Sequence, residues 1–294
     1  VWTGGNETNV TGGQDDHTKT TDYVQISTLG NAQSFGELDQ STAQCSSYGS
    51  RIQIWTNGWG QANSVNNYMQ YASFASEGVF VDWGNLTESR RQSCSFNSST
   101  RGITAGGGNP SSSNVMDYIE FSTVGNAVDF GDLISGRRTG NCACSSPTRG
   151  FIAASDNGSI GVVSIASKGN EVRTGDLSIY NGSYKASASN QVKGIFAGGS
   201  PFRKHIENYN LSTGGNAKEF GELRHGRNHN VGAANGVRFL SAGGGEAPDT
   251  ANRVNNIDFI SISSGGNAQE FGDLVTKRAS FSGHSDSHGG LGGF

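Results

Sequence analysis

Tyr-Ile-Glu-Phe-Ser-Thr-Val-Gly-Asn-Ala-Val-Asp-Phe-Gly-Asp-Leu, Tyr118 to Leu133, is one copy of a unit that recurs along the whole chain. The other copies begin at Tyr23, Tyr71, Val162, Asn208 and Phe259. A glycine after the aromatic position marks each copy, at Gly36, Gly84, Gly131, Gly175, Gly221 and Gly272. The chain therefore consists of six repeats spaced by about 44 to 51 residues, a period typical of β-propeller blades.

Each repeat is expected to contain four strands. In one repeat the third strand is predicted at Tyr118 to Ser122 and the fourth at Val128 to Leu133. Apolar residues alternate along the third strands, which is the period of a β-strand, and these side chains are expected to be buried between neighbouring blades. They are Val24, Ile26, Ile119, Phe121, Tyr209, Leu211, Ile260 and Ile262. The recurring Gly-Asn pair between the two strands, such as Gly125-Asn126, suits a hairpin turn. The sequence predicts an all-β fold, a six-bladed β-propeller of four-stranded blades in one domain, residues 1–294.

The two ends of the chain carry complementary parts of one repeat. Ala279 to Ser285 matches a first strand, while Val1 to Gly5 matches a second strand that ends in two glycines. We therefore expect the ring to be closed by N- and C-terminal strands sharing one blade, with Val1 to Gly5 beside the strand that contains Phe281. Such closure leaves no long sheet edge unpaired.

Composition excludes two classes of partner. The net charge is −4 and the pI about 5.9, so the chain has no basic field for nucleic acid. Hydrophobic residues make up 33%, and no apolar run approaches the roughly 20 residues of a membrane span. We therefore expect no nucleic acid partner and no membrane insertion.

Four cysteines are present, and three of them lie about one repeat apart. Cys45, Cys94 and Cys144 are separated by 49 and 50 residues, which predicts equivalent positions in three consecutive repeats. We expect reduced, buried thiols, because free cysteine packs as a small hydrophobic residue. Disulfides remain an alternative at this point.

The repeats resemble the kelch repeat. A double glycine closes the predicted second strand in four of them, at Gly4-Gly5, Gly106-Gly107, Gly198-Gly199 and Gly243-Gly244. A strand, a polar turn, an aromatic residue and then arginine follow, and the resemblance covers essentially the whole chain. Unit two has Asn57-Gly58 at the double glycine, and unit four has Ala153-Ala154 there. The copies of Gly-Asn-Ala-x-x-Phe-Gly-(Asp/Glu)-Leu are also similar to kelch-like repeats of structural and tail-fibre proteins of marine phages.

No residue set in the sequence supports catalysis, and we expect a protein that is not an enzyme and holds no metal or cofactor. Kelch propellers that are copper oxidases need a cluster of Tyr and His ligands, whereas the six histidines here are scattered. Arginines recur after the fourth strands, at Arg90, Arg91, Arg137, Arg138, Arg227 and Arg278. They could face the channel as an anion site. The favoured interpretation is that they pair with the repeated acids Glu37, Asp132, Asp176, Glu222 and Asp273, or cap strand-end carbonyls.

A specific binding site is expected where the repeats differ. The largest departures are Asn6 to Thr21 and Thr56 to Met69, which both link a second strand to a third and should share one face of the ring. The predicted binding residues are Trp59 as a platform for a sugar ring, Tyr68, and Asp15, Asp16 and His17. The aspartates would accept hydroxyl hydrogen bonds or, as an alternative, bind calcium.

The function predicted from these features is that of a non-enzymatic binding or structural module. It would be associated with a virion or fibre and contact a host surface glycan or another structural protein. The alternatives are a secreted carbohydrate-binding lectin and an intracellular kelch adaptor for protein partners. The expected location is the virion or the extracellular space.

Overall fold

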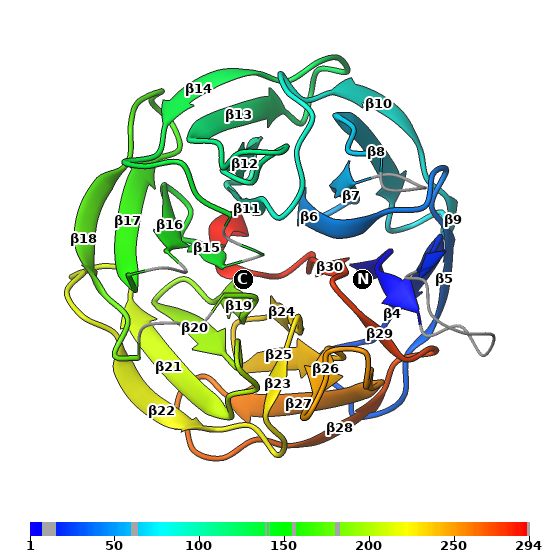
Figure 1. Ribbon diagram of the computed structural model, residues 1–294, viewed down its shortest axis with the longest axis vertical. Helices are drawn as coiled ribbons and strands as arrows, with labels where there is room; N and C mark the ends of the chain where they lie inside the picture. Colours follow the sequence, from blue (N-terminus) through cyan, green and yellow to red (C-terminus); the bar gives the residue numbers. More distant parts are fainter. Residues whose placement is uncertain are drawn as a thin grey trace.

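The computed structural model describes residues 1–7, 16–59, 64–138, 140, 142–154, 157–179 and 183–292. Within these residues, the strands form six blades around a central axis (Figure 1). Each blade is an antiparallel sheet of four strands, with the first strand nearest the axis and the fourth at the rim. The predicted six-bladed propeller of four-stranded blades is confirmed.

The blades are built from consecutive strands, except that blade 1 combines both ends of the chain. Blade 1 contains β30 (Ser282–Gly283), β1 (Trp2–Thr3), β4 (Thr20–Tyr23) and β5 (Gln33–Glu37). Blade 2 contains β6 (Ala43–Gly49), β7 (Gln53–Trp59), β8 (Tyr68–Ser73) and β10 (Val81–Asn85). Blade 3 contains β11 (Cys94–Asn97), β12 (Arg101–Ala105), β13 (Val115–Glu120) and β14 (Val128–Asp132).

The other three blades repeat this order. Blade 4 contains β15 (Ala143–Ser145), β16 (Arg149–Ala153), β17 (Ser159–Ser164) and β18 (Val172–Asp176). Blade 5 contains β19 (Ala186–Ser189), β20 (Lys193–Ala197), β21 (His205–Asn210) and β22 (Lys218–Glu222). Blade 6 contains β24 (Val231–Ala234), β25 (Arg238–Ala242), β27 (Asn256–Ser261) and β28 (Gln269–Asp273).

Short strands lie outside the blades. β2 (Asn6–Glu7), β3 (Asp16–His17) and β29 (Arg278–Ala279) form one small sheet. β23 (Arg227–Asn228) pairs with β26 (Gly245–Glu246), and β9 (Gly78–Val79) pairs with β5. A 3-10 helix, η1 (Gly289–Leu291), follows the last strand. No helix of the described residues is long and apolar enough to cross a membrane.

The ring closes in blade 1 as the sequence predicts. β1 pairs with β30 through Trp2 opposite Gly283 and Thr3 opposite Ser282. On its other side β1 pairs with β4. The strand next to Phe281 therefore lies beside the N-terminal strand, and Phe281 itself is fully buried.

The third strands begin earlier than predicted. β13 covers Val115–Glu120 rather than Tyr118 to Ser122, so Phe121 stands in the turn after the strand. Most of the apolar residues expected between the blades are buried, namely Ile119, Tyr209, Leu211, Ile260 and Ile262. Val24, Ile26 and Phe121 are only half-buried, although each packs against a core cluster. The expectation of full burial was wrong for these three.

Each outer strand contains a β-bulge, and the extra residue is aromatic in five blades and Thr174 in blade 4. In blade 3 the register between β13 and β14 shifts where Met116 faces Gly131 and Asp117 faces Asp129. Phe130 is the extra residue, and it is 1% exposed. The same shift occurs in the other five blades.

The repeated Gly-Asn pair connects blades rather than forming only a hairpin turn. The side-chain oxygen of Asn126 accepts a hydrogen bond from the backbone N–H of Asn85, the last residue of β10 in the preceding blade, at 3.0 Å. The backbone of the pair also approaches the preceding blade, because a Cβ at Gly84 would lie 2.7 Å from the carbonyl oxygen of Gly125. The same asparagine contact recurs at Asn170, Asn216, Asn267 and Asn31. Between blades 1 and 2 the contact is made instead by β9, which pairs in parallel with β5 of blade 1.

All four cysteines are reduced and buried, as predicted. Their predicted equivalence is wrong, because Cys45, Cys94 and Cys144 lie at three different register positions. Ser46, rather than Cys45, faces Asn57, which stands in β7 where Ala105 stands in β12. Cys94 faces Ala105, the last residue of β12, whereas Cys144 faces Phe151 in the middle of β16. The register places Cys142, rather than Cys144, at the position of Cys94.

Candidate functional site

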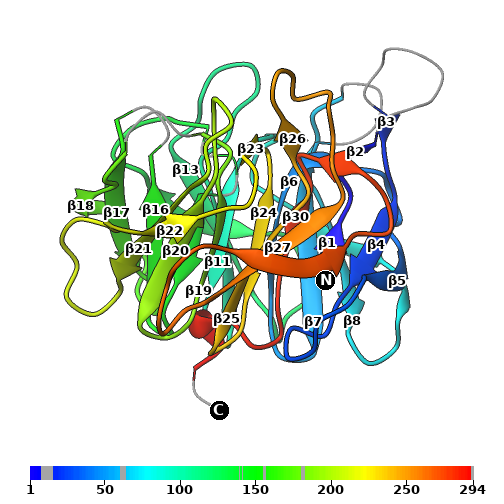
Figure 2. The same cartoon turned by 90° about the horizontal axis from the view of Figure 1, so that it is seen from below.

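The loops between second and third strands lie at one end of the ring, where β2, β3 and β26 are seen at the top of Figure 2. Glu7 fixes the base of the loop in blade 1. Its carboxylate accepts hydrogen bonds from the hydroxyls of Thr20 and Thr276, both at 2.8 Å. Its carbonyl oxygen accepts one from the guanidinium of Arg253 at 2.6 Å. Because Arg253 and Thr276 flank β27 and β28, this loop is held by blade 6 as well as by blade 1.

The predicted binding residues lie at the ends of strands on this loop face. Trp59 is the last residue of β7, with its backbone opposite Ala43. Tyr68 is the first residue of β8. The backbones of Asp16 and His17 pair with Glu7 and Asn6, and the His17 side chain is half-buried. Asp15 lies outside the described residues.

The two irregular loops contact the same residue, Asp39. The Tyr68 hydroxyl donates a hydrogen bond to the Asp39 carboxylate at 2.7 Å. Lys19, from the loop of blade 1, donates to the Asp39 carbonyl oxygen at 2.5 Å. Burial and the hydrogen bond to Asp39 raise the pKa of the Tyr68 hydroxyl above its ordinary value. The segments predicted to share one surface are therefore joined by direct contacts, while their role in binding stays a prediction.

The recurring arginines do not pair with the acids predicted from the sequence. Arg227 and Asp258 form an ion pair at 2.7 Å in which neither side chain is exposed. Arg90 and Asp117 form the equivalent pair at 2.6 Å, and Arg278 pairs with Asp22. The acids lie on third strands, not on the fourth strands that carry Glu37, Asp132, Asp176, Glu222 and Asp273.

The other part of the prediction, that the arginines cap strand-end carbonyls, is confirmed for Arg90, Arg227 and Arg278. Arg90 donates to the carbonyl oxygen of Val115 at 2.8 Å, and Val115 is the first residue of β13. Arg227 donates in the same way to Asn256 at 3.0 Å, and Arg278 to Thr20 at 2.9 Å. In blades 1, 3 and 6 these three side chains therefore join the segment before the first strand to the third strand, and their contacts leave them unavailable as anion ligands in the channel.

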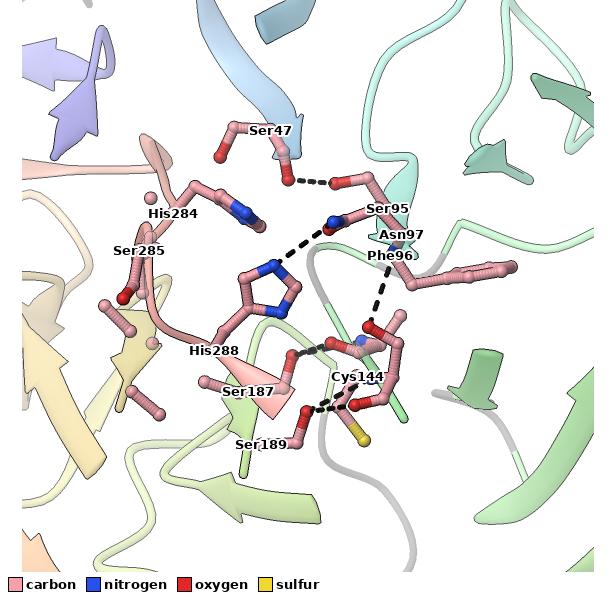
Figure 3. Close-up of a pocket in the computed structure, with 18 residues that line it drawn as sticks. Ser47, Ser95, Phe96, Asn97, Cys144, Ser187, Ser189, His284, Ser285 and His288 are labelled. Atoms are coloured by element: carbon pink, nitrogen blue, oxygen red, sulfur yellow. Dashed lines mark hydrogen bonds between the residues drawn. The ribbon is translucent and has the colours of Figure 1, made fainter. Parts of the chain in front are cut away.

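The C-terminal segment fills the central channel. After β30 the chain crosses the axis and ends in η1 beside β11 and β15 (Figures 1 and 3). His288 caps η1, its Nδ1 accepting a hydrogen bond from the Gly290 N–H at 3.1 Å. Its Nε2 lies 3.1 Å from the side-chain nitrogen of Asn97. The His284 ring packs against the His288 ring with centroids 4.3 Å apart.

A small polar cavity remains beside this segment. Its volume is about 50 Å³, and it is lined by inner-strand residues of several blades together with His284 and His288. Serine hydroxyls tie the neighbouring inner strands together. Ser95 donates to the Ser47 carbonyl oxygen at 2.5 Å and Ser189 to that of Ser145 at 2.6 Å (Figure 3). A cavity of this size can hold ordered water, since about 10–15 Å³ of such space is enough for one molecule.

Burial keeps the two channel histidines neutral. It lowers the pKa of His288 to about 3 and that of His284 well below its ordinary value. A neutral imidazole is a metal ligand, but within the part of the chain that the structure describes no three His, Cys, Asp or Glu side chains converge as a metal site. The pair acts as packing and capping groups for the segment that fills the channel.

The sequence prediction missed this segment, although two glycines signal it. Gly289 and Gly290 follow the last repeat and fit where a side chain would meet the carbonyl oxygens of Asn190 and Asn97. Such close backbone approach requires glycine. A Gly-Gly pair outside the repeat, preceded by a histidine, was the available signal.

Comparisons with known proteins support the fold. No protein-family model matches the sequence, and no curated protein matches it. A solved structure titled "Structure of YjhT" is similar to the chain with a TM-score of 0.67 and 10% identity, over 84% of this chain and 89% of that one. A likeness at this identity supports the kelch-like β-propeller fold alone, and it carries no support for a phage origin.

Proposed function

We propose that this chain is a non-enzymatic binding module that contacts a surface glycan through the loop face of blades 1 and 2. The observation that carries the proposal is the filled channel. Because the C-terminal segment occupies the axis, the proposal places the ligand at the irregular loops, the other large departures from the repeat. Their joint contact with Asp39 supports a single surface made by both loops.

Within this proposal, Trp59 is the stacking platform for a sugar ring. Tyr68, His17 and the aspartates Asp15 and Asp16 offer polar groups to its hydroxyls. The indole gives a flat apolar face, and the Tyr68 hydroxyl is already oriented by Asp39. The proposed role is binding without a chemical reaction, so it requires neither a cofactor nor a metal.

A glycan array tests this proposal with the full chain and two variants. We expect binding by the natural chain, a loss of at least about fivefold for Trp59→Ala, and retention of most binding by Trp59→Phe, since stacking contributes about 1 kcal/mol or more. Near-ultraviolet circular dichroism confirms that both variants are folded. Unchanged glycan binding by a folded Trp59→Ala variant would exclude this surface.

The second candidate ligand is a neighbouring structural protein in a virion or fibre. Exposed valines at the start of three consecutive outer strands favour it, because Val81, Val128 and Val172 are 49%, 49% and 64% exposed. Such residues suit side-by-side contact at the rim. The location on a virion or fibre is proposed from the resemblance of the repeats to those of phage structural and tail-fibre proteins. Co-migration of the chain with purified particles tests this location. Recovery of the chain only as a free monomer would contradict it.

A further inference from the structure

Basic residues on the second strands join four of the blades to the blade that follows. Each begins its strand, and they are Arg101, Arg149, Lys193 and Arg238. Arg149 donates to the carbonyl oxygens of Leu211 and Ser212, the two residues after the third strand of the next blade, at 2.6 and 3.3 Å. The other three basic residues donate to the corresponding carbonyl oxygens at 2.7 to 3.2 Å. Each of these blade interfaces therefore contains a site for one cationic side chain.

The site for the base consists of backbone carbonyls and an aromatic ring. The charged groups of the four basic residues lie 5.1, 5.5, 4.8 and 5.2 Å from the centre of a ring. Among the described residues, only Arg101 also has a carboxylate partner, Glu120 at 2.6 Å. Carbonyl oxygens and the face of an aromatic ring are both attracted to a cation. These two kinds of group therefore suffice to hold the base.

The interface between blades 2 and 3 has the acceptors of this site but not the base. Gln53 begins β7, at the register position that Arg101 has in β12. The corresponding acceptors are the carbonyl oxygens of Phe121 and Ser122, which follow β13. Neither oxygen accepts a hydrogen bond from the part of the chain that the structure describes. The replacement of a base by Gln53 therefore leaves two acceptors unused.

An open groove of about 400 Å³ lies where the base would be. Its lining includes Gln53, Phe121 and Ser122. In blades 4, 5 and 6 the first residue after the third strand is at most 1% exposed, namely Ile165, Leu211 and Ile262. Phe121 stands at the same position in blade 3 and is half-buried. Because the stem of a long basic side chain covers apolar surface, its absence leaves part of Phe121 open to solvent.

The open side of Phe121 belongs to a well-supported ring. Phe121 stacks on the buried Trp55 with ring centroids 4.4 Å apart and an angle of 12° between the planes. Arg51 also lines the groove, and its guanidinium donates to the Gly292 carbonyl oxygen at 2.9 Å. The groove thus combines an aromatic surface with two neighbouring carbonyl acceptors. A guanidinium suits both, because its planar fork can donate to two oxygens and lie against a ring.

We propose that this groove binds an arginine side chain of a partner protein. The guanidinium donates to the carbonyl oxygens of Phe121 and Ser122, and the aliphatic stem covers the open part of the Phe121 ring. Arg149 makes the same contact within the chain. The turns between first and second strands lie at the end of the ring opposite the loop face, because neighbouring strands of a blade are antiparallel. The inference is therefore independent of the proposed glycan surface.

A nuclear magnetic resonance titration of the full chain with N-acetyl-arginine amide tests the proposal. We expect saturable shifts of the Phe121 and Ser122 amide signals. N-acetyl-citrulline amide, which has nearly the same shape but no charge, should bind at least about fivefold more weakly.

Two variants separate this groove from general charge effects. Gln53→Arg places a base of the chain itself in the groove, so it should abolish saturable binding there and raise the melting temperature by about 2 °C or more. The matched control, Gln191→Arg, adds the same charge to an exposed turn of blade 5, where Lys193 already fills the site. It should change neither the binding nor the melting temperature.

Three results would overturn the proposal. They are the absence of saturable shifts, equal affinity for the arginine and citrulline amides, and equal binding by Gln53→Arg and Gln191→Arg. A stabilised Gln53→Arg variant beside a natural chain that binds no arginine amide would mean that the site accepts a base only from its own strand. Gln53→Lys fills the groove as Lys193 fills its own site, and it keeps the test decisive if Gln53→Arg is unstable.

Discussion

Gly161 determines which acid neutralises the buried arginine of blade 4. In blades 1, 3 and 6 an aspartate on the third strand pairs with the arginine. Gly161 takes that register position in blade 4, and the Glu171 side chain fills the space that a Cβ at Gly161 would need. Glu171 pairs with Arg137, and its other oxygen accepts the Ile134 N–H at 3.0 Å. Blade 4 therefore keeps a buried ion pair, but its acid comes from the residue before the fourth strand instead of from the third strand.

A double-mutant cycle tests this exchange. Glu171→Ala should lower the free energy of unfolding by about 3–5 kcal/mol, because it leaves Arg137 buried without its acid. Gly161→Asp alone should also destabilise, because its side chain overlaps Glu171. The double variant Gly161→Asp/Glu171→Ala should recover a large part of the loss by restoring the arrangement of blade 3. The free energies of unfolding are measured in urea. If the losses of the two single variants add in the double variant, an aspartate at position 161 does not replace Glu171 as the partner of Arg137.

At the scale of the strand, the outer bulge and the Gly-Asn pair work together to join blades. The glycine after the bulged aromatic residue has a positive φ and lies against the next blade. Gly131, at φ +143°, would place a Cβ 2.5 Å from the Gly169 carbonyl oxygen and 3.0 Å from the Asn170 side-chain oxygen. That same oxygen accepts the Asp132 N–H at 3.0 Å. A side chain at this glycine would therefore separate two blades at their rim.

We expect Gly131→Ala to lower the free energy of unfolding by about 2 kcal/mol. The alanine combines backbone strain of about 1–3 kcal/mol with the overlap described above. Urea unfolding with unchanged slope gives the measurement. Gly236→Ala is the matched control, since a Cβ there meets nothing within 4 Å. A loss no larger than that of the control would mean that the rim contacts contribute little to stability.

At the scale of the whole molecule, the repeat predicted the architecture because each copy carries its own local signals. The double glycines at Gly106-Gly107 both have positive φ, at 63° and 91°, and end β12 as expected. The complementary ends predicted closure through Trp2 and Gly283. The glycines lie within a single repeat and the two chain ends carry complementary parts of one repeat, so both features could be predicted from the sequence.

Contacts between blades were harder to predict. The Gly-Asn pair looked like a turn because its partner, such as Asn85 for Asn126, lies 41 residues away. The acid partners of the arginines were sought on fourth strands, whereas Arg90 pairs with Asp117 on a third strand. For the predicted binding surface, the sequence indicated loops, while the contact of Tyr68 with Asp39 required the structure.

The segment in the channel joins blades that lie far apart in the sequence. His288 contacts Asn97 of blade 3, while the carbonyl oxygen of Gly292 accepts a hydrogen bond from Arg51 of blade 2 at 2.9 Å. Gly289 lies against Asn190 of blade 5. This segment therefore supports the ring from within, and its histidines are neutral in the folded chain.

Stability should consequently fall in mild acid. Burial holds the His288 pKa at about 3, whereas an unfolded histidine titrates near 6.5, so the unfolded chain binds more protons below neutrality. Between pH 7 and pH 5, His288 alone should lower the free energy of unfolding by about 2 kcal/mol, and His284 acts in the same direction. His288→Asn keeps a side chain that can cap η1 but removes the titrating ring, so its stability should depend less on pH. Urea unfolding of both chains at pH 5, 6 and 7 gives the slopes, and equal slopes would mean that His288 has the same pKa in the folded and the unfolded chain.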